Sequence, residues 1–318
     1  MRYWLTRLGG AVLLLLAISA LTFGAMNVLG DPLFNILGST AKDVTNPESV
    51  VKIEAAKEEY HLDDPLPVRY AIWLGGFVRG DFGVQFSEDG QPPVKDLIVE
   101  RLPRTLSLVI LAQLMALAIS LPWALWSASR ANSKADKVST TGAFLMIAVP
   151  NFALAVILSY IFSIKLNWFP LAYRADDPFL SRFHQMLLPA LTLAIPAAAV
   201  YQRLLRTDLI TTLQEDFILT ARAKGVSRRS ILFKHALRPS LFSFVTVFAI
   251  TTGALIGGAL VVESIFLIPG LGRAIVEAVL REDFPVVLAI VMLVSAIFVF
   301  LNLIIDLIYS LIDPRVRR

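Results

Sequence analysis

Six long apolar runs constrain the fold of this chain more than any other feature. They are rich in Leu, Ile, Val, Ala and Phe, nearly free of charge, and cover residues 8–29, 105–126, 142–164, 185–202, 241–262 and 285–310. About 20 apolar residues in a helix cross a hydrocarbon core about 30 Å thick. Because backbone polar groups inside lipid must be satisfied within the segment, each run is expected to be a helix. The sequence therefore predicts an all-α polytopic membrane protein with about six transmembrane helices.

The first run has two possible interpretations. Arg2 and Arg7 precede it, as basic residues precede a secretory signal. However, the run is longer than the apolar region of a signal peptide, and no small-x-small cleavage site follows it. We interpret it as an uncleaved spanning helix. Prolines inside the later runs are expected to kink their helices; they are Pro122, Pro150, Pro189 and Pro196.

The positions of the basic residues predict that both termini are cytoplasmic. With the N-terminus inside, 16 of the 29 Lys and Arg residues fall on the inner side, with only six of the 25 acidic residues. The two short outer loops hold five basic residues, namely Lys165, Arg174, Arg182, Arg273 and Arg281. The positive-inside rule applies to short loops, so this imbalance sets the orientation.

The chain divides into three predicted parts. Residues 1–29 form the inner N-terminal end and the first span, residues 30–104 form an outer segment, and residues 105–318 form the core. The core holds the other five spans and a cytoplasmic loop at about 203–240. The outer segment is too short for a sizeable independent core. We interpret it as a lid folded onto the helix ends, with a dedicated binding domain as the alternative.

Local signals predict short helices on the outer side. Asn46 followed by Pro47 favours a helix start, with the helix running to about Tyr60. A second helix is expected over 67–77.

A turn and a short interfacial helix are expected after the fifth run. Pro269-Gly270 predicts the turn, and apolar residues at helical spacing follow it. Glu263, at the end of the run, is expected at the membrane interface rather than buried.

The residue inventory excludes several activities. There is no cysteine, and none of His61, His184 and His235 lies in the middle of a run, which argues against thiolate metal sites, metalloproteases and Ser/His proteases. The absence of a G-x-x-x-x-G-K-[ST] motif argues against ATP hydrolysis by this chain. The runs also lack the mid-membrane charge relay of ion-coupled carriers, since Asp306 lies near the inner end of its run. We therefore predict no catalytic residue, metal or cofactor in this chain, and a conduit that takes its energy from elsewhere.

Two polar residues inside the runs have alternative interpretations. Gln113 and Asn151 either hold helices together through hydrogen bonds or line a transport pathway.

The basic loop between the fourth and fifth runs predicts two short helices joined at Gly225. Phe217, Ala221 and Lys224 fall at helical spacing, Gly225 follows as a C-cap signal, and Ser227 can cap the next helix. Such a helix pair suits insertion into a groove of a partner. A solvated loop that only obeys the positive-inside rule is the alternative.

The loop carries a sequence motif in addition to its basic charge. Asp216-Phe217, then 220–225 (TARAKG), then 235–238 (HALR) resemble the EAA loop of ABC importer permeases, in the form found in the peptide/nickel permease family. Further matching segments lie along the whole chain, at 66–70, 73–74, 79–83, 100–106, 263–273 and 313–317. Two positions depart from the generic loop motif, which has Glu at the place of Leu219 and Pro at the place of Arg238.

The resemblance implies a fold, a function and partners. The fold would be that of a type I ABC importer permease in a bacterial cytoplasmic membrane. Its partners would be a homologous second permease subunit, two cytoplasmic ATPase subunits that bind ATP and Mg, and an outer solute-binding protein, besides membrane lipid; no nucleic acid is implied. Coupling to the ATPase is expected through six loop residues, namely Asp216, Phe217, Ala221, Arg222, Lys224 and Gly225.

The expected function is ATP-driven import of oligopeptides or dipeptides by alternating access. Nickel, glutathione and haem are alternative cargoes for the same machinery. An ATP-independent channel or secondary carrier is the alternative of a different class.

Overall fold

The computed structural model describes residues 2–29, 32–43, 45–86 and 90–312. Five helices in this part of the chain are long and apolar enough to cross a membrane. They are α1 (Arg2–Leu29), α5 (Val94–Ser129), α8 (Phe179–Thr212), α11 (Leu237–Ile265) and α13 (Phe284–Ile312). Each contains one of the expected apolar runs, which confirms five of the six.

The third run forms two helices with a sharp break between them. α6 (Lys134–Ala148) is followed by α7 (Asn151–Leu158), which continues as the π-helical segment η2 (Ser159–Lys165). The two parts are bent by 101°, so they form either one broken span or a re-entrant pair. Pro150 precedes α7 as its N-cap with an extended ψ of 143°. The kink expected at this proline is therefore a complete break, whereas α8 runs through Pro189 and Pro196.

The chain forms two compact units, which are described separately. Unit 1 comprises residues 1–103 with 273–318. In it α1 packs against α13, and α4 (Leu66–Val78) contacts α1. The smaller helices are α2 (Pro32–Leu37), the 3₁₀ segment η1 (Gly38–Lys42) and α3 (Pro47–Glu59).

The two helices expected in the outer segment are confirmed as α3 and α4. The side chain of Asn46 caps α3 by accepting a hydrogen bond from the Glu48 backbone N–H at 3.0 Å, with Pro47 in the first turn as expected. The position of this segment over the helix ends stays a prediction.

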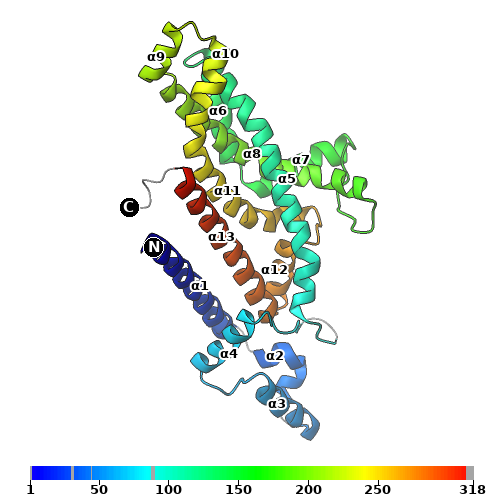
Figure 1. Ribbon diagram of the computed structural model, residues 1–318. Helices are drawn as coiled ribbons and strands as arrows, with labels where there is room; N and C mark the ends of the chain where they lie inside the picture. Colours follow the sequence, from blue (N-terminus) through cyan, green and yellow to red (C-terminus); the bar gives the residue numbers. More distant parts are fainter. Residues whose placement is uncertain (1, 30–31, 44, 87–89, 313–318) are drawn as a thin grey trace. The chain divides into compact units, whose positions relative to one another are not determined.

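Unit 2 comprises residues 104–272 and is built around α8. This helix packs against α11, α6 and α7 (Figure 1). Its Leu193, Tyr201 and Leu205 are fully buried, so α8 forms the core of the unit. The same helix is long and apolar enough to cross a membrane.

The end of α11 buries a carboxylate. Glu263 is 0% exposed, so the expectation of an interfacial position is wrong. Its Oε2 accepts a hydrogen bond from the Gly272 N–H at 2.7 Å, because the chain turns back over the helix end. A Cβ at Gly272 would lie 2.5 Å from the Cα of Leu260, and one at Gly270 would collide with the Glu263 carboxylate. The two glycines thus make room for the buried carboxylate. The helix expected after this turn is confirmed as α12 (Leu271–Leu280).

Candidate coupling site

Helix α9 (Asp216–Ala223) follows α8 after a three-residue turn. It buries one edge, where Ile218 is 0% and Ala221 8% exposed, and it leaves Phe217 and Leu219 48% and 53% exposed. Two apolar side chains on the outside of so short a helix are available to a partner. Ala221 is one of the residues expected to couple to the ATPase, but within this chain it faces inward.

Gly225 closes the C-terminal end of α9. Its φ is +77°, and its N–H donates to the Arg222 carbonyl at 2.9 Å. The Val226 N–H donates to the Ala221 carbonyl at 3.2 Å, which completes a Schellman motif with Gly225 at the left-handed position. The helix end expected here from the sequence is confirmed, and its geometry requires a residue that tolerates positive φ.

The second helix of the loop is not a separate short helix. Ser227 caps α10 (Arg228–Ser230) as expected, accepting a hydrogen bond from the Ser230 N–H at 3.4 Å. α10 continues through the π-helical segment η3 (Ile231–Ala236) directly into α11, without an intervening loop residue. The helical backbone is therefore unbroken from α10 into the fifth apolar run.

Two contacts hold this continuous helix against the rest of unit 2. The Arg228 guanidinium donates to the Ser129 carbonyl at the end of α5, at 2.8 Å. The hydroxyls of Thr212 and Ser240 lie 3.2 Å apart and join the end of α8 to the start of α11. The base of the loop is therefore tied to two of the long helices.

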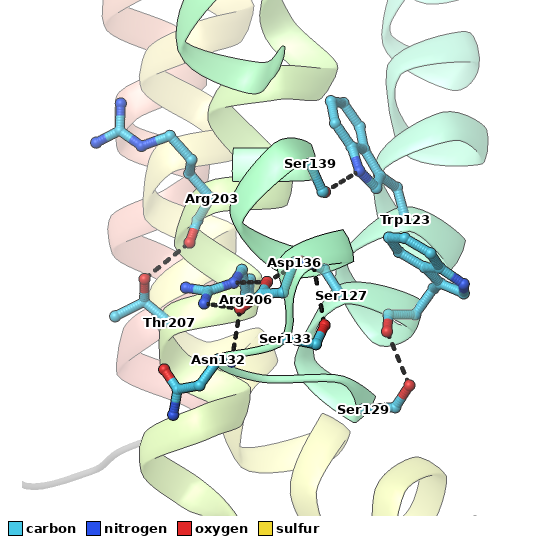
Figure 2. Close-up of polar contacts among 11 residues, drawn as sticks. Trp123, Ser127, Ser129, Asn132, Ser133, Asp136, Ser139, Arg203, Arg206 and Thr207 are labelled. Carbon is cyan, nitrogen blue, oxygen red and sulfur yellow. Dashed lines mark hydrogen bonds and ion pairs between the residues drawn. The ribbon is translucent and has the colours of Figure 1, made fainter. Parts of the chain in front are cut away.

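A buried ion pair joins the start of α6 to α8 (Figure 2). Asp136 is 1% exposed and accepts two hydrogen bonds from the Arg206 guanidinium, at 2.6 Å from Nε and 2.5 Å from Nη2. The Ser127 hydroxyl and the Asn132 N–H also donate to this carboxylate, at 2.6 and 2.9 Å. Ser133 caps α6 by accepting from the Asp136 N–H at 3.2 Å. The carboxylate thus fixes α5, the turn and α6 to one guanidinium of α8.

Further contacts fasten α6 on both sides. The Trp123 indole of α5 donates to the Ser139 hydroxyl at 2.6 Å. The Arg203 guanidinium of α8 lies over the Phe144 ring at 4.2 Å, in the geometry of a cation–π contact. The cytoplasmic ends expected for α5, α6 and α8 are therefore held together as one body beside the loop.

Gln113 connects three long helices. Its Nε2 donates to the Phe248 carbonyl at 3.3 Å and to the Thr252 hydroxyl, both on α11, and its Oε1 accepts from the Tyr201 hydroxyl of α8 at 2.8 Å. Gln113 itself is 5% exposed. These contacts give it the helix-packing role; its role in lining a pathway stays a prediction.

Asn151 begins α7 and lies against α11. A Cβ added at Gly258 would stand 2.9 Å from the Asn151 Nδ2, so the glycine permits this close approach. Asn151 is half-buried, and its expected place in a pathway also stays a prediction.

The six residues expected to couple to the ATPase lie on α9 and the turn that closes it. Of the six residues expected to couple, Ala221 is buried and the others are exposed around α9 and its closing turn. Among the described residues, no group of three or more His, Asp or Glu side chains could hold a metal ion.

Comparison with known proteins identifies the family. Residues 120–318 match the family described as binding-protein-dependent transport system inner membrane component, and residues 1–109 match the N-terminal part of such membrane components. The chain is also 37% identical to the oligopeptide transport system permease protein AppB of Bacillus subtilis, over 96% of this chain and 95% of the relative. The chain belongs to this permease family.

The permease is also similar to a second curated protein and to a solved structure. The glutathione transport system permease protein GsiC of Escherichia coli K12 is 35% identical, over 100% of this chain and 99% of the relative. A solved structure of the MetNI methionine ABC transporter in an inward-facing conformation matches with a TM-score of 0.55 at 17% identity. The match covers 68% of the permease and 96% of that chain, and at this identity it shows the fold alone.

The Asp136–Arg206 pair of this permease is not predicted from the sequence. Both residues entered only the count of charges on the inner side. A usable signal was present, because Ser133-x-x-Asp136 before an apolar run is a capping pattern. Nothing in the sequence linked that cap to Arg206, 70 residues away. The C-terminal motif at 313–317 lies outside the described residues.

Proposed function

We propose that this permease is the membrane subunit of an ATP-driven importer that moves oligopeptides or dipeptides by alternating access. The similarity to an oligopeptide permease over nearly the whole chain supports a peptide cargo. Glutathione, itself a short peptide, and also nickel and haem are the alternative cargoes.

The observation that carries the coupling proposal is the unbroken helix behind α9. Energy from ATP must reach the spanning helices through a rigid element with two arrangements. The closed turn at Gly225 joins α9 to a helix that runs without interruption into α11. When the ATPase subunits close, they displace α9, and α10 and α11 move with it.

The ion pair in Figure 2 fits the same mechanism. Asp136 and Arg206 fix α6 and the end of α5 to α8, the helix from which α9 emerges. Breaking a buried pair of this kind costs about 3–5 kcal/mol. The base of α9 therefore moves as one body with these helices.

The assembly follows from the proposed coupling. Two cytoplasmic ATPase subunits bind ATP and Mg and receive the α9 regions of this permease and of a homologous second permease subunit. An outer solute-binding protein delivers the cargo. The excess of basic residues beside α9 supports a cytoplasmic position for the loop and both termini in a bacterial cytoplasmic membrane.

Site-specific cross-linking tests the proposed contact. The chain has no cysteine, so Phe217→Cys and Leu219→Cys each introduce a single thiol. The two positions match in exposure but lie about 200° apart around α9. In the assembled complex, Phe217→Cys is expected to cross-link to the ATPase subunit, and Leu219→Cys is expected to form little of this cross-link. Equal reaction with water-soluble reagents at both positions, without any cross-link, would exclude α9 as the contact.

A further inference from the structure

Helix α4 presents an apolar surface that the described residues leave uncovered. No residue of this helix is buried, and four apolar side chains along it are 44–78% exposed, namely Leu66, Val68, Ile72 and Val78. The helix has 13 residues and is about 20 Å long, too short to cross a bilayer. Arg69 is its only charged residue. Such a surface requires an apolar partner.

Side-chain contacts join α4 to the apolar span of α1. The Tyr70 hydroxyl lies 2.7 Å from the Ser19 hydroxyl of α1, and the Phe23 ring packs on Tyr70 and Trp73 with centroids 5.6 and 5.5 Å apart. Ser19 lies within the apolar span Thr6–Val28, about 14 Å from its nearer end at 1.5 Å per residue. α4, which lies at the lower end of α1 in Figure 1, therefore reaches the apolar span of α1 through its aromatic side chains, whichever side the N-terminus faces.

A cavity of about 290 Å³ opens between α4, the end of α1 and the start of α13. Its apolar wall includes Phe23, Trp73, Phe82 and Phe284. This volume is close to the lower end of small-molecule sites, which begin at about 300 Å³. All lining residues belong to unit 1.

Charges of both signs line the same cavity. Arg69 is half-buried, and no hydrogen bond to its guanidinium occurs within the described part of the chain. Asp64, which acts on it electrostatically, lies 3.2 Å from the His61 Nδ1. Glu59 and Asp81 line the cavity as exposed carboxylates. The cavity thus offers a guanidinium to a phosphate and carboxylates to an ammonium.

We infer that α4 lies in the bilayer interface and that this cavity holds the head-group region of one phospholipid, which carries an ammonium. The phosphate binds Arg69, the ammonium faces Glu59 and Asp81, and acyl carbons contact the aromatic wall. A peptide carries the same two charges, but the level of the Ser19 contact favours lipid. The inference does not depend on the transport function.

Depth measurements test the position of α4. In the assembled complex in liposomes, fluorophores are placed on Ile72→Cys and on Val51→Cys of α3; both residues are exposed, and the chain has no other thiol. Spin-labelled lipid is expected to quench the label at position 72, and aqueous iodide the label at position 51. Iodide quenching of both labels to the same extent would overturn the inference.

Lipid retention tests the head-group site. Native mass spectrometry of the purified complex compares Arg69→Gln with Arg79→Gln, which removes the same charge at an exposed position outside the cavity. Loss of a charge-assisted hydrogen bond is expected to lower retention of phosphatidylethanolamine about tenfold in the first variant only. Equal retention in both variants would overturn the proposal. Photo-cross-linking of a peptide instead of the lipid in the cavity would also overturn it, and would assign the cavity to cargo.

Discussion

Replacement of Gly225 isolates backbone geometry from packing. Its φ of +77° is in the left-handed region. Adopting this conformation costs a residue with a Cβ about 1–2 kcal/mol more than it costs glycine. No heavy atom of its surroundings lies within 4 Å of a Cβ added there, so the strain is conformational alone. That free energy corresponds to a factor of about 5–30 in the population of the closed turn. Gly225→Val is therefore expected to lower substrate-stimulated ATPase activity by up to about this factor.

The matched control is Gly225→Asn, because asparagine tolerates the left-handed conformation better than other residues with a side chain. Stimulated ATPase activity is measured in the reconstituted complex, after gel filtration has shown that each variant assembles. Stimulated ATPase activity is expected to be highest with glycine at position 225, lower with asparagine and lowest with valine. Full stimulation in assembled Gly225→Val would refute the coupling role of this turn. Ala221→Asp is a poorer test, because Ala221 is buried and a carboxylate there would also destabilise the fold.

Three further tests concern the packing of unit 2. Asp136→Asn leaves the Arg206 guanidinium without its carboxylate and is expected to destabilise the protein by about 3 kcal/mol in thermal unfolding. Adding Arg206→Gln is expected to restore part of this stability. Additive losses of stability in the double variant would contradict the pairing. Gly272→Ala is expected to lower the melting temperature, at a cost of about 1–3 kcal/mol, because its Cβ would overlap α11, whereas Gly257→Ala, with open space around it, is not. Tyr201→Phe is expected to cost about 1 kcal/mol by removing the bond to the buried glutamine of α5; an unchanged melting temperature would argue against that bond.

The sequence predicts those parts of the fold that depend on local pattern. Apolar length is sufficient for α1, α5, α8, α11 and α13, since burial in lipid leaves a helix as the only backbone solution. Helix capping is equally local. The helix starts predicted at Asn46 and Ser227 and the helix end predicted at Gly225 are therefore confirmed.

The rest depends on contacts between distant residues. Pro150 predicts a disturbance, but its 101° size depends on packing of α7 against α8 and α11. The sequence predicts an interfacial Glu263 because the apolar run ends there, and only the fold of the next turn supplies a backbone donor to its carboxylate. The inward position of Ala221 and the pairing of Asp136 with Arg206 likewise depend on helices that meet only in the folded chain.

Peptide transport by the purified complex is the most direct test of ATP-driven import. The permease is reconstituted in liposomes with its second permease subunit, the ATPase subunits and the solute-binding protein, and uptake of a labelled oligopeptide is followed with and without ATP. Uptake is expected only with ATP and with all subunits present. Equal uptake by this chain alone, without ATP, would contradict ATP-driven import and indicate a channel or secondary carrier.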